Sequence, residues 1–297
     1  MILISGAAGK TGLAIIQALS RRGKSVRAWV YREEQRQRVL TQGAAEVITG
    51  DMLEERVWRE ALQGTEAVYH ICPNMSPDEE AIADILLKEL RRLNGVRLVY
   101  HSVLHPQVEA MPHHWAKMRV EERIFASGVP FTILQPCAYF QNLLAFRQSV
   151  LEQGVLSIPY STQARLSMVD LLDVAGVAAK VLSETGHEGA IYELAGPQPV
   201  SHEQVAATLS RLLNRPIQAQ SIPLEDWIHQ AERSGMSAYA VNTLAKMFAY
   251  YDAHGLIGNA RVLECLLGRA PVSLEAFLSR EFLPSGRVDG LKPQSTL

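Results

Sequence analysis

Cysteine is scarce in this sequence, and long apolar runs are absent. The three cysteines Cys72, Cys137 and Cys265 lie far apart, without a CxxC pair. This spacing argues against a disulfide framework or a structural zinc site, so we expect no metal. The longest apolar runs have strand length, too short to span a membrane. No signal peptide precedes the strand-like start, so we expect a cytoplasmic protein.

The sequence also lacks an excess of charge of one sign. The formal net charge of the 297 residues is -2, and acids and bases are spread along the chain. No basic tract indicates a nucleic-acid partner, and no like-charge block indicates a disordered tail. Hydrophobic residues make up 47% of the chain, enough for a substantial core. We therefore expect a globular protein that acts on a small-molecule substrate.

Short β-rich runs alternate with helical patterns through the first half of the chain. The runs lie at 2–5, 25–30, 45–49, 66–71, 96–101 and 130–135. Strand, helix and strand repeated at this length predict right-handed crossovers and a parallel sheet. Several runs are almost wholly apolar, as expected when helices cover both faces of the sheet.

After about residue 136 the pattern changes. A helix-like stretch and two short strand-like runs lead to a helix that starts near Asp170, and residues 189–196 read as another strand. Helical patterns then dominate, at 201–213, 224–233, 237–252 and 273–281. We expect an α/β doubly wound domain at 1–150, to which 170–195 returns. Residues 151–297 would form a smaller, mostly helical C-terminal substrate lobe.

The sequence GAAGKTG at 6–12 directly follows the first strand. A P-loop would need a glycine five positions before Gly9, where Ile4 stands. Gly6, Gly9 and Gly12 instead fit a dinucleotide loop: a tight turn, a close approach to pyrophosphate, and helix packing. We expect this loop, with Ala8, Lys10 and Thr11, to hold the cofactor. A glycine-rich turn without a ligand is the alternative.

Arg32 stands at the end of the second strand, twenty residues after Gly12. Its guanidinium could pair with a 2′-phosphate, which favours NADP(H) over NAD(H). The alternative is that Arg32 begins a solvated helix. The neighbouring Glu33 keeps NAD(H) possible, because an acid at this place can hold the ribose hydroxyls.

Two later strand ends supply further candidate contacts, because ligands lie at the carboxyl ends of parallel strands. Asp51 and Met52 follow the third strand, where the Asp51 carboxylate could meet the adenine amine or cap the next helix. Cys72, Pro73 and Asn74 follow the fourth strand and could line the nicotinamide ribose. Cys72 would be a packing contact rather than a reactive thiol.

The sequence resembles the NmrA-like family, atypical members of the short-chain dehydrogenase/reductase superfamily. The resemblance extends over nearly the whole chain and is carried by GAAGKTG at 6–12, GD at 50–51, HHWAKMRVEERIFASGVPFTILQPCAYFQNLL at 113–144, SMVDLLDVA at 167–175, YELAGPQPVS at 192–201 and LGRAPVSLEAFL at 267–278. It implies a Rossmann-like NAD(P)-binding domain with a small C-terminal lobe. It also implies two kinds of function. Some members are NADPH-dependent reductases of quinones, dyes or phenylpropanoid ethers, and others are redox sensors that bind the dinucleotide and control a protein partner.

The catalytic Tyr-x-x-x-Lys pair of ordinary short-chain dehydrogenases lacks its tyrosine here. If Lys117 is the lysine, His113 occupies the tyrosine position. On a helix His113, His114 and Lys117 share one side. Lys117 could bind the ribose, or donate a proton after burial lowers its pKa. Either histidine could protonate a substrate near neutral pH, unless both are simply solvated at an exposed helix start.

Three more residues are expected near the nicotinamide. Ser102 follows the fifth strand, where it could contact the cofactor or serve as a turn or cap residue. Tyr139 and Asn142 follow the sixth strand. Tyr139 could supply an acid or a stacking wall, or belong to the core. An apolar cleft lined by Tyr139 and Trp115 would favour an enzyme.

The missing tyrosine argues against simple alcohol dehydrogenation. It matters less for a quinone, which accepts hydride readily and could be protonated by lysine, histidine or water. The sequence therefore favours an NAD(P)H-dependent oxidoreductase that passes hydride to a small conjugated acceptor such as a quinone. The alternatives are a redox sensor without turnover and a reductase of a specialised metabolite.

Overall fold

The computed structural model describes residues 1–93 and 95–283. In these residues a seven-stranded sheet has the order β10-β6-β5-β4-β1-β2-β3, and every neighbouring pair is parallel. Its strands are β1 (Ile2–Ile4), β2 (Val26–Val30), β3 (Glu46–Thr49), β4 (Ala67–His70), β5 (Arg97–His101), β6 (Phe131–Pro136) and β10 (Ala190–Leu194). The expected parallel α/β sheet is confirmed, and each β-rich run of the first half overlaps a strand.

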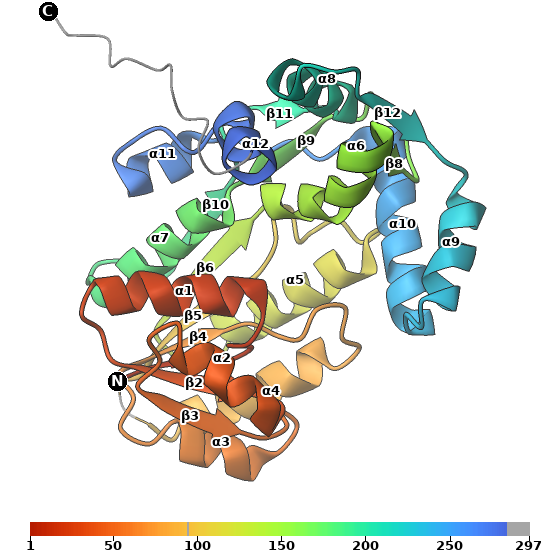
Figure 1. Ribbon diagram of the computed structural model, residues 1–297. Helices are drawn as coiled ribbons and strands as arrows, with labels where there is room; N and C mark the ends of the chain where they lie inside the picture. The colour runs from red at the N-terminus through yellow and green to blue at the C-terminus, as the bar shows by residue number, and fades with distance from the viewer. Residues whose placement is uncertain (94, 284–297) are drawn as a thin grey trace, which may run out of the picture.

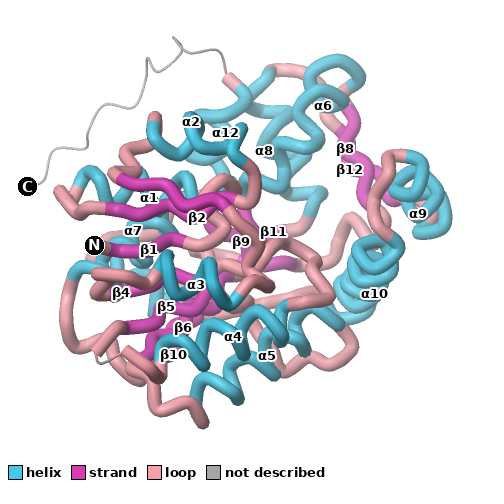
Figure 2. Tube along the Cα trace, turned by 90° about the horizontal axis from the view of Figure 1, so that it is seen from below, coloured by secondary structure: helices cyan, strands magenta, loops and turns pink. Residues whose placement is uncertain are grey.

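Helices cover both faces of this sheet (Figure 2). On one face lie α1 (Lys10–Arg21), α2 (Arg36–Leu40) and α7 (Leu171–Ser183), and on the other lie α3 (Glu55–Ala61), α4 (Glu79–Leu90) and α5 (Pro112–Phe125). Strand β1 shows how the sequence divides the two cores: Ile2 and Ile4 join the first, and Leu3 joins the second. Successive strand residues point to opposite faces, so an all-apolar strand supplies both.

The chain after β6 builds a second group of elements (Figure 1). They are β7 (Ala138–Tyr139), α6 (Arg147–Gln153), β8 (Val155–Ile158), β9 (Leu166–Val169), β11 (Pro199–Val200), α8 (His202–Leu213), β12 (Gln218–Ser221), α9 (Leu224–Arg233), α10 (Ala238–His254), α11 (Arg261–Leu267) and α12 (Leu274–Phe282). β9 lies between β11 and β7, and β8 pairs with β12. The stretch at 138–154 is not one helix, because it holds β7, a 3₁₀ helix at Phe140–Phe146 and α6.

Two segments from the later part of the chain return to the first domain. β10 pairs with β6 at the edge of the sheet, and α7 packs beside α1. The buried carboxylates at the start of α7 then anchor the C-terminal helices: Asp170 binds Arg280 at 2.8 Å and Asp173 binds Arg269 at 2.6 Å. The division of the chain near residue 150 stays a prediction, and residues 284–297 of the predicted lobe lie outside the described residues.

Two general features bear on the class of site. In the described part of the chain, no helix is long and apolar enough to cross a membrane. The same residues contain no cluster of three or more histidines, cysteines or acids that could hold a metal ion.

Candidate functional site

A cavity of about 990 Å³ extends from the glycine loop to the C-terminal helices. Nearly all the residues predicted for the site line it: Gly6, Ala8, Gly9, Lys10, Thr11, Gly12, Asp51, Met52, Cys72, Pro73, Asn74, Ser102, His113, His114, Lys117, Tyr139 and Asn142. Arg32, a predicted cofactor contact, does not line it, and its side chain is exposed. The structure thus brings the predicted residues together, while the role of each stays a prediction.

The glycine loop has the shape that a pyrophosphate requires. Gly6 has a φ of +59°, which a residue with a side chain rarely adopts. A Cβ on Gly12 would lie 2.7 Å from the backbone of Ala7, so α1 can pack this closely only with glycine there. No side chain caps α1, whose N-cap is Gly9, and no acid stands in its first turn. Its first N–H groups are therefore available to an anion, and the loop fits a dinucleotide.

At the end of the cavity beyond the glycine loop, two exposed apolar side chains form the border. Tyr31 and Leu53 line it although they are 66% and 44% exposed. Asp51 accepts a hydrogen bond from the Leu53 N–H at 2.9 Å, so it acts as a turn residue and still borders the cavity. An exposed aromatic and an aliphatic side chain beside a carboxylate could receive an adenine ring.

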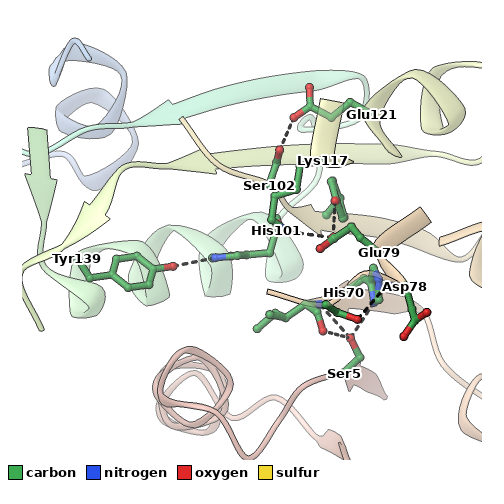
Figure 3. Close-up of polar contacts among 12 residues, drawn as sticks. Ser5, His70, Asp78, Glu79, His101, Ser102, Lys117, Glu121 and Tyr139 are labelled. Atoms are coloured by element: carbon green, nitrogen blue, oxygen red, sulfur yellow. Dashed lines mark hydrogen bonds and ion pairs between the residues drawn. The ribbon is translucent and has the colours of Figure 1, made fainter. Parts of the chain in front are cut away.

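Lys117 is held by a carboxylate that the sequence did not reveal. Its Nζ donates to Glu79 Oε1 at 2.9 Å and to the His101 carbonyl at 3.2 Å (Figure 3). Tyr100 Oη donates to the same Glu79 oxygen at 2.8 Å. Burial raises the pKa of the Glu79 carboxyl, but Lys117 and Tyr100 together hold that pKa below its ordinary value. The ammonium therefore has a fixed place in the cavity wall.

A second buried network joins three strands. Tyr69 Oη lies 2.6 Å from His101 Nδ1, and Tyr139 Oη lies 2.8 Å from His101 Nε2. Figure 3 shows the Tyr139 ring pointing its hydroxyl at the imidazole. Burial, followed by the nearby charge of Lys117, lowers the pKa of His101 to about 3. The imidazole between the two phenols is therefore neutral at pH 7.

His113 and His114 are not solvated, which corrects that alternative. His114 is 3% exposed, and its Nδ1 donates to the His105 carbonyl at 3.1 Å. Burial lowers the pKa of His113 to about 3 and that of His114 to about 4. Both rings are therefore neutral near pH 7, and a catalytic role for either of them stays a prediction. A neutral imidazole can still donate or accept a hydrogen bond.

Ser102 lies in the cavity wall, and its hydroxyl already has a hydrogen-bond partner. Its hydroxyl donates to Glu121, which is 2% exposed and also accepts from Gln135 Nε2 at 2.9 Å. Burial raises the pKa of the Glu121 carboxyl. Cys72 is also a packed group, since burial raises the pKa of its thiol far above the ordinary value. These contacts fit Ser102 and Cys72 as wall residues rather than reactive ones.

Lys10 connects the glycine loop to the segment after β6. Its Nζ donates to Asn142 Oδ1 at 2.7 Å and lies 5.6 Å from the centre of the Tyr139 ring. Burial lowers the pKa of Lys10. The loop and the Tyr139 segment, predicted from separate motifs, are thus joined at one place.

The other end of the cavity is apolar and aromatic. Tyr160 stacks on Phe248 with ring centres 5.6 Å apart, and Trp227 meets Phe248 edge-on at 4.8 Å. Between Leu143 and Leu256 no charged side chain lines the cavity. Trp115 does not line it and is 36% exposed, which corrects the expectation for that residue. The aromatic wall comes from α9, α10 and the loop after β8 instead.

The fold and cavity together define a dinucleotide-binding α/β protein with a separate apolar subsite. The chain belongs to the NmrA-like family, whose sequence profile matches residues 1–281. It is 27% identical over 274 residues to the NAD(P)H azoreductase of Xenophilus azovorans, covering 91% of this chain and 93% of the relative. It is 27% identical over 285 residues to quinone oxidoreductase 2 of Escherichia coli strain K12, covering 95% and 99%.

A solved structure agrees with these relatives. The NADPH-dependent quinone oxidoreductase of Escherichia coli, complexed with NADPH, has a TM-score of 0.84 to this chain at 26% identity. The match covers 95% of this chain and 100% of that one. The expected Rossmann-like fold and family are confirmed, and the comparisons support the expected class of NAD(P)H-dependent oxidoreductase.

Proposed function

We propose that this protein binds NADPH and reduces a small conjugated acceptor such as a quinone. One observation carries the proposal: a single cavity joins the glycine loop to an uncharged aromatic subsite. A site of this kind places a dinucleotide and a flat apolar molecule next to each other. When bound, the nicotinamide supplies a hydride.

The chain's own residues would hold the dinucleotide along its length. The first turn of α1 would bind the pyrophosphate through free N–H groups. Tyr31 and Asp51 would border the adenine, and Lys117 would contact the nicotinamide ribose. Lys117 already has a fixed position through Glu79, so little rotamer freedom would be lost on binding.

The charges after β2 support a preference for NADPH over NADH. The Glu33 carboxylate accepts from the Thr49 hydroxyl at 2.8 Å and lies 3.8 Å from Arg36, so both of its oxygens already face protein partners. Arg32 is exposed and takes part in none of the ion pairs among the described residues. Its guanidinium could swing onto a 2′-phosphate and pair with it bidentately.

The acceptor would lie between Tyr139 and the aromatic wall of Tyr160, Trp227 and Phe248. A quinone that gains a hydride also needs one proton to become a hydroquinone. Tyr139 supplies a phenol to the cavity wall, and Lys10 and Lys117 supply cations. The neutral rings of His113 and His114 would hydrogen-bond the acceptor without changing its charge.

The test is NADPH consumption by the purified protein against a panel of quinones, with NADH in parallel. Saturable turnover that prefers NADPH is the expected result. NADPH binding without turnover on any acceptor would overturn the reductase and favour the sensor of a protein partner. Turnover on complex natural ethers alone would favour the reductase of a specialised metabolite.

A further inference from the structure

We propose that Tyr69 and His101 are positioning residues that turn the hydroxyl hydrogen of Tyr139 toward the acceptor. The proposal rests on the proposed function for its kinetic consequence, but its structural part can be tested without turnover. Neither Tyr69 nor His101 belongs to a sequence motif of the site. Both stand on strands whose ends border the cavity.

The three residues form a chain that runs from the core to the cavity. Tyr69 on β4 is fully buried, and His101 at the end of β5 is 8% exposed. Tyr139 on β7 is half-buried and lines the cavity. The two hydrogen bonds are 2.6 Å and 2.8 Å long, at opposite nitrogens of one imidazole. Each ring nitrogen therefore has one phenol as its hydrogen-bond partner, and it acts as either donor or acceptor in that bond.

The hydrogen-bond partners available to Tyr69 decide which group donates in each of these two hydrogen bonds. A neutral imidazole has one N–H and one acceptor nitrogen, so one phenol donates to it and the other accepts from it. Among the described residues, His101 is the only hydrogen-bond partner of the Tyr69 hydroxyl. If Tyr69 accepted from Nδ1, its own buried O–H would lack a partner, which is unfavourable.

The satisfied arrangement has Tyr69 donating to Nδ1 and the Nε2–H donating to the Tyr139 oxygen. The oxygen of Tyr139 then accepts from the core, and its own O–H must point elsewhere. Because Tyr139 lines the cavity, that hydrogen can point into it, where the Thr11 hydroxyl and the place of the acceptor lie. With the opposite polarity, the Tyr139 O–H would donate to His101 Nε2 and could not donate to the acceptor.

The chemical consequence is that Tyr139 can donate its proton while a hydrogen bond already stabilises the negative charge that develops on its oxygen. The acceptor gains a hydride from the nicotinamide, and the Tyr139 O–H bond breaks as an O–H bond forms on the acceptor oxygen. Burial raises the pKa of Tyr139, which opposes this step. The Nε2–H of His101 points at the oxygen where negative charge develops and offsets that cost. Water returns a proton to Tyr139 after the hydroquinone leaves.

Tyr69 does not pass its own proton along the chain. Burial raises its pKa well above the ordinary value, so a Tyr69 phenolate in the core would be costly. The hydroxyl acts by fixing which nitrogen of His101 carries the hydrogen. This separates a positioning role from a proton relay, since only a relay would require Tyr69 to ionise.

The direct test is the tautomer of His101, read by two-dimensional ¹⁵N NMR of the imidazole in the full-length protein. We expect the hydrogen on Nε2 in the wild type and a shift toward the Nδ1–H form in Tyr69→Phe. An Nδ1–H tautomer in the wild type would overturn the proposal, whether or not the protein reduces quinones. Failure of the quinone assay alone would overturn only the proposed function.

The kinetic test compares two acceptors in Tyr69→Phe. 1,4-Naphthoquinone needs a proton when it is reduced, whereas the triarylmethane cation malachite green takes hydride on carbon and becomes neutral without one. We expect kcat for the quinone to fall about tenfold, the effect of losing roughly 1.4 kcal/mol. Turnover of the dye and the Kd for NADPH should stay within about twofold of the wild type. Equal losses with both acceptors would contradict the proposal.

Three further variants separate positioning from damage to the fold. His101→Gln can keep an N–H toward Tyr139, so it should retain more quinone turnover than His101→Leu. Tyr192→Phe is the matched control, because Tyr192 makes a similar bond to His187 Nδ1 at 3.0 Å outside the cavity. It should leave both reactions unchanged. Equal activity of the glutamine and leucine variants would argue against a hydrogen bond from residue 101.

Discussion

The ammonium of Lys117 on α5 lies 2.9 Å from the carboxylate of Glu79 at the start of α4. The two side chains are 13% and 8% exposed. Charges this far from water are stable only when paired and hydrogen-bonded, and Tyr100 supplies the additional bond. The pair therefore fixes a positive charge in the wall of the cavity, where a ribose or a developing negative charge could meet it.

Glu79→Gln is expected to destabilise the fold and weaken cofactor binding together. Removing one partner of a buried ion pair leaves the other charge uncompensated, at a cost of about 3–5 kcal/mol. Urea unfolding measures the first effect and NADPH titration the second. The control is Glu122→Gln, which removes an exposed partner of Arg119 and should change neither quantity. Equal unfolding midpoints for the two variants would show that the Glu79 pair is not buried in solution.

The buried histidines predict that stability falls in mild acid. The folded-state pKa of His101 is about 3 and that of His70 about 4, against an ordinary value of 6.5. Their contribution is fully present above pH 6.5. It is lost as the pH falls from 6.5 toward 4, because there the unfolded chain binds protons that the folded chain does not.

Urea unfolding at pH 7, 6 and 5 measures this slope. His101→Gln should reduce it by up to about 1.4 kcal/mol per pH unit, the value for one proton. His229→Gln is the control, since His229 is exposed and should leave the slope as it is. A slope unchanged by His101→Gln would mean that this ring charges in the folded state.

Gly12→Ala is expected to disrupt the cofactor loop. The new Cβ would lie 2.7 Å from the backbone of Ala7 and Gly6, so α1 or the loop would have to shift. We expect the Kd for NADPH to rise at least about tenfold, because a displacement moves the N–H groups off the phosphates. Gly176→Ala is the matched control, a helix glycine whose Cβ would meet Leu267 at an ordinary 3.8 Å. It should be neutral or slightly stabilising.

Much of the fold could be predicted because local pattern and tertiary position agree there. Residues 2–4 are apolar at every position, and β1 lies inside the sheet between β4 and β2, with both faces covered. The stretch 138–154 was harder, since its apolar spacing fits a helix. There β7 pairs with β9, and a 3₁₀ helix follows. A long-range strand pairing of this kind leaves little trace in local periodicity.

The residues of the site also divide into those that the sequence indicates and those that only the tertiary structure reveals. The glycine loop is indicated by its spacing, and Lys117 by the contiguous family motif that carries it. Glu79 and Lys117 are 38 positions apart, and Tyr69 and His101 are 32 apart, so only the packing of different elements brings them together. The signal that could have found Tyr69 and His101 was their place on strands whose ends should face a ligand.

Arg32→Ala is expected to change the preference between the two dinucleotides. Loss of a guanidinium that pairs with the 2′-phosphate should raise the Kd for NADPH about tenfold and leave the Kd for NADH unchanged. Titration of both cofactors by fluorescence measures the ratio. Arg38→Ala removes another exposed arginine, on α2, and serves as the control for general loss of positive charge. If the two variants weaken NADPH binding equally, Arg32 is not the discriminating residue.

Trp227→Ala is expected to affect the acceptor and spare the cofactor. The Trp227 indole meets Phe248 edge-on at 4.8 Å and lines the apolar end of the cavity, away from the glycine loop. Losing one aromatic contact of about 1 kcal/mol should raise KM for a quinone about fivefold, with kcat and the Kd for NADPH little changed. Trp115→Ala is the matched control, because Trp115 lies on α5 beside the catalytic candidates and yet outside the cavity. A larger effect on KM from Trp115→Ala than from Trp227→Ala would mean that the acceptor binds near Trp115 and not between Tyr139 and Trp227. The aromatic wall of α9 and α10 would then have to serve something other than the hydride acceptor.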